Sequence, residues 1–297
     1  MKLKRLGETG LIERLAKYAK GIGDDCAVIR LSKKKSLLVT IDMLLEDTDF
    51  RLKEASPYQI GWKSLACGLS DIAAMGGAAK YAVVSLGLPK KLTVEFVDEM
   101  YRGIRALAKK FNVDIVGGDT NSSAKLIVDV AVLGFTGQAP PVLRSGAKRG
   151  DIICVTGSLG GSYKSKRHLT FTPRLRESRC LVSGFKINSM IDISDGLSTD
   201  LSHIAKASGV GACIYEELIP VSKDARGVAA ALNEGEDFEL LFTMPLGEAR
   251  RLAKRTLEAG GVKITQIGEI LDKRIGVKII GRDGRTTDLK AKGFSHF

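Results

Sequence analysis

The sequence predicts an α+β fold made of two domains, each with helices layered against a sheet. The chain has 297 residues, which is long enough for two separate cores. Strand pairs and long helical segments are segregated along the chain, whereas a doubly wound parallel sheet would show a regular alternation of the two. Two adjacent prolines, Pro140 and Pro141, interrupt the pattern, which then restarts. We therefore predict domains at residues 1–137 and 138–297.

The composition is that of a folded protein without a membrane span. Hydrophobic residues make up 44% and charged residues 27%, which argues against a disordered chain. No apolar run approaches the roughly 18 residues that a membrane-spanning helix needs, and residues 1–8 lack the apolar core of a secretory signal. Five scattered cysteines, an odd number, favour reduced thiols, and the three histidines lie too far apart for zinc-ligand spacing. We expect a cytoplasmic protein with no membrane partner.

The formal net charge of +12 has two interpretations. One is a lysine-rich solvated surface. The other is attraction for a polyanion, either nucleic acid or a phosphorylated small molecule. Aromatic residues make up only 6% of the chain and are not interleaved with basic blocks, which weakens the case for a single-strand stacking platform.

The N-terminal half contains a helix with a well-defined start. Ser56 can cap its first turn, Pro57 suits the first helical position, and Gln59 completes a capping box. Gly68 is the predicted end of this helix, with Asp71 following on a short apolar segment. Hydrophobic spacing predicts the other elements: helices at residues 7–20 and 93–111, and strands at 36–43, 81–88, 113–116 and 125–134.

The C-terminal half shows the same mixture of elements. Its patterns predict strands at residues 152–156, 212–215, 264–267 and 275–280, a further strand at the end of residues 235–243, and helices at 198–207 and 248–259. Residues 163–188 are basic and read as irregular. The glycine-rich residues 157–162 follow a strand without forming a Walker A motif, and they are equally consistent with a phosphate loop and a flexible loop.

Carboxylates recur at the ends of apolar strands or beside glycine turns. This set comprises Asp24, Asp25, Asp42, Asp71, Asp119, Asp192 and Asp195. Oxygen ligands without histidine or cysteine favour Mg²⁺, which binds through a few carboxylates together with substrate phosphates. Such an arrangement is typical of phosphoryl transfer. Acids that only cap helices and satisfy turns are an equally consistent interpretation of the pattern.

Several motifs occur in order along nearly the whole chain, at residues 23–27 (Gly-Asp-Asp-Cys-Ala), 40–42 (Thr-Ile-Asp), 61–63, 69–76, 117–120 (Gly-Gly-Asp-Thr), 192–197 (Asp-Ile-Ser-Asp-Gly-Leu), 235–243 and 293–297. Together these motifs resemble those of the thiamine-monophosphate kinase family. The wider superfamily, with aminoimidazole ribonucleotide synthetase and selenophosphate synthetase, shares the acidic ATP site but not the full set of motifs.

The resemblance implies an N-terminal sheet that pairs with its twin in a homodimer, and a site for ATP and several Mg²⁺ ions between the domains. It implies metal ligands at Asp25, Thr40, Asp42, Asp71, Asp119, Asp192 and Asp195, with Asp42 and Asp71 essential for catalysis. It implies ATP contacts at Tyr101, Gly118, Asp119, Arg144 and Ser194. It places thiamine monophosphate against Asp49, Glu236 and Phe294.

The chain departs from the family pattern at three places. Ile41 stands where the family often has a second threonine, so a side-chain ligand is lost there. Asp49 stands where the motif usually has histidine, and residues 163–188 are shorter than the usual insertion. The implied reaction is direct in-line transfer from ATP to thiamine monophosphate, giving thiamine diphosphate and ADP without a phosphorylated enzyme.

Four alternatives are compared with this function. Selenophosphate synthetase would need a reactive cysteine in the N-terminal glycine-rich segment, and residues 7–23 contain none. Aminoimidazole ribonucleotide synthetase is the enzymatic alternative, distinguished by the acceptor that consumes ATP. A basic nucleic-acid-binding protein is the alternative of another class, with salt-dependent binding as its test. A family member without catalytic activity is disfavoured because the principal acidic positions are filled.

Overall fold

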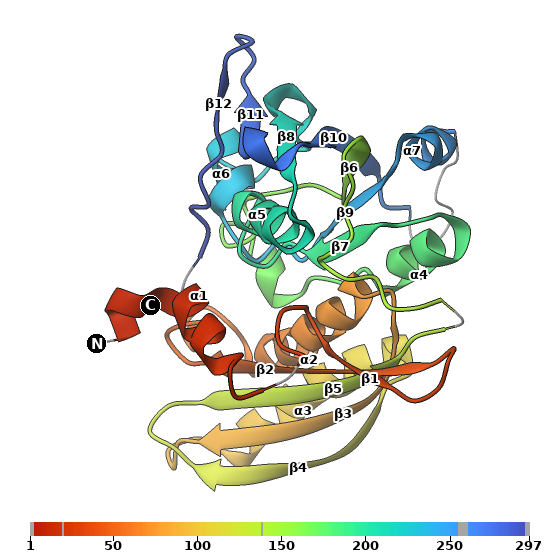
Figure 1. Ribbon diagram of the computed structural model, residues 1–297. Coiled ribbons are helices and arrows are strands. Elements are labelled where there is room, and N and C mark those ends of the chain that lie inside the picture. The colour runs from red at the N-terminus through yellow and green to blue at the C-terminus, as the bar shows by residue number, and fades with distance from the viewer. Residues whose placement is uncertain (1–2, 20, 138, 255–260, 295–297) are drawn as a thin grey trace.

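The computed structural model describes residues 3–294 apart from residues 20, 138 and 255–260. The N-terminal half contains a five-stranded sheet with the order β1-β2-β5-β3-β4 (Figure 1). The strands are β1 (Ala27–Arg30), β2 (Ser36–Leu45), β3 (Ala78–Leu88), β4 (Asp114–Ser122) and β5 (Ile127–Phe135). Only the β3–β4 pair is parallel. Helices α2 (Pro57–Ala74) and α3 (Val94–Phe111) lie against one face, and α1 (Leu3–Leu15) precedes the sheet.

The C-terminal half contains a seven-stranded sheet with the order β12-β11-β8-β10-β6-β9-β7. Its strands are β6 (Asp151–Thr156), β7 (Ser189–Asp192), β8 (Gly211–Tyr215), β9 (Leu240–Pro245), β10 (Ile264–Leu271), β11 (Val277–Ile280) and β12 (Thr286–Asp288). Its helices are α4 (Leu175–Gly184), α5 (Leu197–Ser208), α6 (Val228–Asn233) and α7 (Leu246–Ala253), with short 3₁₀ turns η1 (Arg167–Leu169), η2 (Glu216–Leu218) and η3 (Lys273–Ile275). The predicted α+β class is confirmed.

Helix α2 begins as predicted but ends later. Ser56 Oγ accepts from the Gln59 amide at 3.3 Å, and the Ser56 amide donates to Gln59 Oε1 at 2.9 Å, which confirms the capping box. The predicted end at Gly68 is wrong, because the helix continues to Ala74. A Cβ at Gly68 would lie 2.7 Å from Val132 Cγ2 on β5. Glycine here permits close helix-to-sheet packing, and Asp71 consequently lies inside the helix rather than after it.

Other boundaries also differ from the predictions. Residues 163–188 are not simply irregular, since they contain η1 and α4. Residues 117–120 lie inside β4, not beyond its end, because their backbone pairs with β3. The first helix ends at Leu15 instead of residue 20 and contains a non-helical Gly7. Helix α7 ends at Ala253, and most of the rest of its predicted range, residues 255–259, lies outside the described residues.

Two apolar cores hold the structure together, and one of them crosses the domain boundary. It joins α2, α3 and the inner face of the N-terminal sheet to side chains such as Phe171, Leu181 and Phe242 in the C-terminal half. The second core lies around α5 and the middle of the C-terminal sheet. Because helix α2 contacts α4, β7 and η1 as well as its own sheet, it is the main structural link between the halves.

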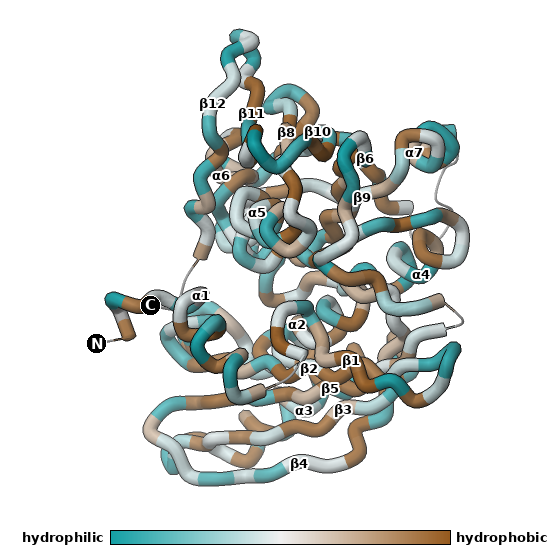
Figure 2. The backbone as a smooth tube through the Cα atoms, in the orientation of Figure 1, coloured by the Kyte–Doolittle hydropathy of each residue, from teal (hydrophilic) through white to brown (hydrophobic). Residues whose placement is uncertain are grey.

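The outer face of the N-terminal sheet carries exposed apolar side chains. Along β2, Ile41 and Met43 are 65% and 61% exposed, whereas Thr40 and Leu44 point inward and are buried. Figure 2 shows apolar positions along β1 and β2 in this part of the sheet. Apolar surface of this kind is suited to covering by another protein surface. Among the described helices, none combines the length and apolar character needed to cross a membrane.

We predict that Gly61→Ala destabilises the protein by about 3 kcal/mol, because overpacked cores typically lose this much. A Cβ at Gly61 would lie 1.9 Å from the Met100 carbonyl oxygen, so α2 and α3 would have to separate. Gly247→Ala is the matched control, since a Cβ there meets nothing within 4 Å. Urea unfolding measures both variants. Equal stability of G61A and the wild type would contradict the packing described for these helices.

Candidate active site

Helix α2 presents polar side chains to the C-terminal half of the protein. Lys63, Ser70 and Asp71 are seven and eight residues apart, which places them along one side of the helix. Ser70 Oγ donates to Asp192 Oδ2 at 2.6 Å. Asp71 is bonded to the N-terminal sheet, because Thr40 Oγ1 on β2 donates a short hydrogen bond to Asp71 Oδ2. The helix therefore brings residues of both domains to one polar centre.

Carboxylates from four separate segments converge on this centre. Asp25, Asp71 and Asp192 each offer an oxygen, and these oxygens lie within 4.8 Å of one another. Asp42, at the inner face of β2, is the neighbouring carboxylate that most raises the pKa of Asp71. These four residues form what we call the carboxylate cluster, and they were separated by up to 167 positions in the sequence.

Burial and mutual repulsion raise the pKa values of the whole cluster. Burial is the largest cause, and it raises the pKa of Asp42 to about 7 and that of Asp192 to about 8. The pKa of Asp71 is raised well above its usual value, first by burial and then by the charges of Asp42 and Asp192. The pKa of Asp25 is raised by burial although Arg144 opposes the shift. Such a cluster is stable in its ionised form only beside positive charge.

The cluster has the properties of a site for divalent cations. Among the described residues, Asp25 Oδ2 and Asp42 Oδ2 are buried without a hydrogen-bond partner. The nearby thiols of Cys26 and Cys67 have pKa values raised by burial, so they remain protonated and are poor ligands. The available donors are therefore carboxylate and hydroxyl oxygens, which Mg²⁺ prefers.

Arg144 and Ser194 border the cluster. Arg144 Nη2 donates to Asp25 Oδ1 at 2.6 Å, and the Arg144 amide donates to Asp24 Oδ1 at 2.6 Å. This pairing holds the segment after the two prolines against the residues that follow α1. Ser194 lies two residues beyond Asp192, and its carbonyl accepts from the Glu236 amide at 2.7 Å. Arg144 thus lies where the halves of the protein meet, whereas the Ser194 contact lies within the C-terminal half.

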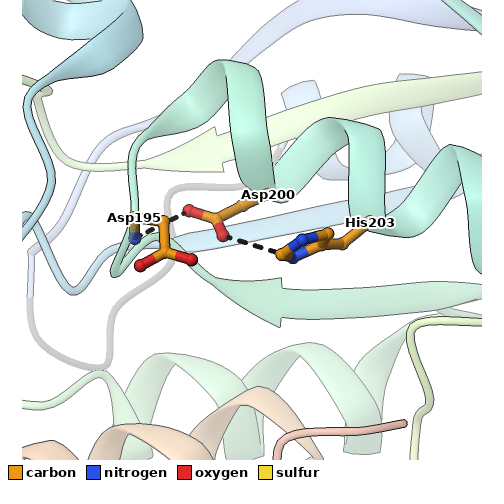
Figure 3. A group of neighbouring side chains, drawn as sticks. All are labelled: Asp195, Asp200 and His203. Carbon is orange, nitrogen blue, oxygen red and sulfur yellow. Dashed lines mark hydrogen bonds and ion pairs between the residues drawn. The ribbon is translucent and has the colours of Figure 1, made fainter. Parts of the chain in front are cut away.

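Asp195 belongs to a second acidic group at the start of α5. It lies near Asp200 and His203, as Figure 3 shows. Asp200 Oδ2 accepts from the amides of Asp195 and Gly196 at 3.2 and 3.0 Å, and Asp200 Oδ1 lies 3.8 Å from His203 Nδ1. Burial lowers the pKa of His203 to about 4, so its imidazole is neutral. Asp195 is therefore beside the carboxylate cluster rather than within it.

Asp119 and Gly118 lie away from the cluster within one chain. Asp42 pairs across the sheet with Val130, which pairs with Val84, which pairs with Gly118. Three strand spacings correspond to about 14 Å. Asp119 is in register with Met43, whose exposed side chain marks the outer face of the sheet. A single chain therefore does not place Asp119 beside Asp42.

The remaining predicted ATP contact, Tyr101, is partly buried on α3 and packs against the core that crosses the domain boundary. Its pKa is raised by burial. Helix α3 packs against α2, and among the described contacts Tyr101 has no hydrogen bond or ion pair with the carboxylate cluster.

Lys63 connects two of the predicted substrate residues, and sequence reasoning did not select it. Its side chain is fully buried, and its Nζ lies 2.5 Å from Glu236 Oε2. The same Nζ donates to the Asp49 carbonyl at 2.8 Å and lies 3.3 Å from His168 Nδ1. Phe294 lies against the same segment as Glu236, because its amide donates to the Asp195 carbonyl at 3.1 Å and the Glu236 amide donates to the adjacent Ser194 carbonyl at 2.7 Å. A lysine on the buried side of a helix, seven residues before Ser70, was the available signal.

The glycine-rich residues 157–162 are anchored by carboxylates. The Gly160 amide donates to Asp237 Oδ2 at 2.7 Å, and the Gly161 amide donates to Glu234 Oε2 at 2.9 Å. Asp237 also pairs with Arg167 at 2.7 Å. Because these two amides already have acceptors within the chain, they are not open donors of the kind that a phosphate loop presents.

Family comparisons cover both domains. The description "AIR synthase related protein, N-terminal domain" matches residues 23–136, and "AIR synthase related protein, C-terminal domain" matches residues 148–280. A thiamine-monophosphate kinase from Bacillus subtilis is 38% identical over 93% of each chain. One from Aquifex aeolicus is 33% identical over 100% of each chain, and one from Escherichia coli K12 is 34% identical over 93% of this chain and 91% of its own.

Solved thiamine-monophosphate kinase structures also superpose on this chain. "AaThiL complexed with AMPPCP and TMP" superposes with a TM-score of 0.88 at 33% identity, covering 100% of this chain and 99% of the other. Thiamine monophosphate kinase from Aquifex aeolicus has a TM-score of 0.83 at 31% identity, covering 97% and 100%. Hydrogenase maturation protein HypE in complex with ATP, at 20% identity and a TM-score of 0.73 over 98% of both chains, shares the fold.

We predict that, with divalent cations removed by a chelator, the protein loses thermal stability as pH rises. The pKa values of Asp42 and Asp192 are about 7 and about 8 in the folded protein, compared with an ordinary value of 3.8. The folded protein therefore holds these two protons more tightly than the unfolded chain does. The stability that is fully present below the unfolded-state pKa is lost as pH rises through the two folded-state values. We expect the Tm to fall by roughly 5 °C between pH 6 and pH 9.

Asp192→Asn is the matched control for this measurement, because it removes one titrating carboxyl and should reduce the fall. Differential scanning calorimetry with and without Mg²⁺ measures the effect, which the cation should diminish. An identical pH dependence in the wild type and D192N would contradict the assigned electrostatics.

Proposed function

The chain belongs to the thiamine-monophosphate kinase family of AIR synthase related proteins, and we propose that it phosphorylates thiamine monophosphate with ATP. It is a phosphotransferase, as its full-length relatives are named. The main support for this specific reaction is the carboxylate cluster between the two domains. The chain that carries it also superposes over its whole length on a structure complexed with AMPPCP and TMP. A cytoplasmic location is part of the proposal, supported by five free thiols.

The reaction proposed is a direct in-line transfer of the γ-phosphoryl group. The second pKa of a phosphate monoester is about 6, so the acceptor phosphate is already ionised at neutral pH. One of its oxygens can attack the γ-phosphorus of ATP without a general base, and ADP leaves from the opposite side. No phosphorylated residue is needed. The protein must align two mutually repelling anions and reduce their repulsion.

Mg²⁺ ions, when bound, would neutralise the charge of both phosphate groups. The residues proposed to hold them are Asp25, Thr40, Asp42, Asp71 and Asp192, with Asp195 at the start of α5 as a further ligand. The buried oxygens of Asp25 and Asp42 that lack partners among the described residues support this assignment. Asp42 and Asp71 are the two whose loss should affect turnover most.

Arg144 and Ser194 are proposed to contact ATP. The guanidinium of Arg144 now pairs with Asp25, and a phosphate oxygen presents the same kind of acceptor. Thiamine monophosphate is proposed to lie near Asp49 and Glu236, which Lys63 holds together, with Phe294 contributing an aromatic face from the side of α5.

A homodimer would complete the proposed ATP site. Asp119, Gly118 and Tyr101 lie apart from the cluster in one protomer, and Asp119 points to the outer face of the sheet. The same face carries exposed Ile41 and Met43. If two such faces pack together, the partner can supply an outward-facing aspartate that its own chain cannot use. We therefore propose that Asp119 acts in the site of the second protomer.

We predict that Asp42→Asn and Asp71→Asn each reduce kcat about 1,000-fold, since electrostatic stabilisation at an active site typically contributes this much. Asp283→Asn, at an exposed turn, is the control and should keep full activity. The assay combines purified protein, ATP, Mg²⁺ and thiamine monophosphate, with chromatographic detection of thiamine diphosphate. Normal turnover in both cluster variants at saturating Mg²⁺ would refute the roles assigned to them.

We predict that mixing two inactive variants, Asp42→Asn and Asp119→Asn, restores activity after subunit exchange. A heterodimer then contains one site with both aspartates and one with neither, so random pairing should give about one quarter of wild-type activity. Light scattering verifies the dimer, and each variant alone is the control. A mixed dimer that stays inactive would place Asp119 outside the partner's site.

A further inference from the structure

A cavity of about 310 Å³ lies between the segment after β2 and the residues before α4. Its walls include Asp49, Arg51, Glu54, Tyr163, Lys166 and His168. The size is at the lower end of the range for small-molecule sites. This inference rests on the proposed function, because it concerns how the same enzyme would hold the organic part of its acceptor.

The aromatic wall of this cavity is formed by Tyr163 and His168. Their ring centroids are 4.4 Å apart with an interplanar angle of 37°. His168 is buried and is held by Lys63, whose Nζ lies 3.3 Å from His168 Nδ1. Tyr163 remains 47% exposed, so one side of a positioned aromatic ring is accessible from the cavity. Such a ring can stack against another ring or a cation.

The charges around this wall favour a cation over an anion. Arg51 is engaged with Glu54 at 3.2 Å, and Lys166 Nζ donates to the Glu54 carbonyl at 3.3 Å. The carboxylates of Asp49 and Glu236 are close enough to raise the pKa of Tyr163. Burial is the larger cause of that shift, so the phenol is neutral.

Glu236 links the cavity wall to the segment that carries Asp192. Its Oε2 lies 3.6 Å from His168 Nδ1 in the aromatic wall, and its amide donates at 2.7 Å to the carbonyl of Ser194, two residues beyond Asp192. The aromatic wall and the cluster are therefore connected through one residue. A molecule with a cationic ring at Tyr163 could direct a phosphate arm toward the cluster.

We propose that Tyr163, supported by His168, binds the cationic thiazolium ring of the substrate and determines specificity for it. Thiamine monophosphate carries a permanent positive charge on this heteroaromatic ring, to which the phosphate arm is attached. The tyrosine face and the Asp49 carboxylate at the cavity wall both attract that charge, whereas Glu236 is already paired with Lys63. His168 is a positioning residue, since it fixes the tyrosine ring from behind.

The test compares Tyr163→Leu, Tyr163→Phe and the wild type in steady-state kinetics, with each substrate varied in turn. Tyr163→Leu should raise the KM for thiamine monophosphate roughly tenfold, in line with a partly desolvated cation–π contact. The KM for ATP and kcat should change less than about twofold, and Tyr163→Phe should keep the wild-type values because the ring remains. Tyr18→Leu, at a tyrosine that is 82% exposed, is the matched control.

Calorimetric binding separates this proposal from the proposed function. Thiamine and a neutral analogue with thiophene in place of thiazolium are titrated into the wild type and Tyr163→Leu. The wild type should prefer the cation, and the variant should lose most of that preference. An unchanged preference, or equal increases in both KM values, would overturn the role of Tyr163. A wild type that binds thiamine but transfers no phosphate would overturn only the kinase assignment.

Discussion

The structure depends on the burial of several carboxylates at one place between two domains. Asp25, Asp42, Asp71 and Asp192 repel one another, and burial removes the water that would stabilise their charges. Within the described residues, Arg144 is the cation that pairs with the cluster, and Thr40 and Ser70 donate hydrogen bonds to it. These contacts leave oxygens without partners, which is unfavourable for a structural element but suitable for a site that receives cations together with anionic phosphates.

Helix α2 makes this arrangement possible because it combines tight apolar packing with a polar side. Gly61 lets the helix approach the backbone of α3, and Gly68 lets it approach β5. The buried Lys63 and Ser70 and the partly buried Asp71 are thereby held at fixed positions along one helix. Lys63 organises the predicted substrate residues, whereas Ser70 and Asp71 belong to the cluster. A rigid helix of this kind positions the two ends of a substrate relative to each other without relying on mobile loops.

Part of the basic net charge is used in ion pairs within the protein and is not available to attract a polyanion. Many arginines and lysines are engaged in the C-terminal half, where Arg167 pairs with Asp237 and Arg174 with Glu239. These pairs order residues 163–188, a segment that its composition alone suggested was irregular. Ion pairs between residues 65 or 70 positions apart cannot be read from local sequence, because either partner could equally be solvated.

Local sequence was sufficient for the α+β class, most strands, the capping box of α2 and the list of acidic candidates, because these depend on hydrophobic periodicity and neighbouring residues. The family motifs indicated which acidic residues belong to one site, but they did not indicate the distances between those residues. Only the tertiary structure decided that α2 continues past Gly68, since the reason is the nearness of Val132 on another strand. It also decided that Asp71 joins the buried cluster while Asp119 faces outward, and that Lys63 holds Asp49 and Glu236. Such relations arise from sheet register and helix packing, which bring together residues that are remote in sequence and carry no local signal of their partners.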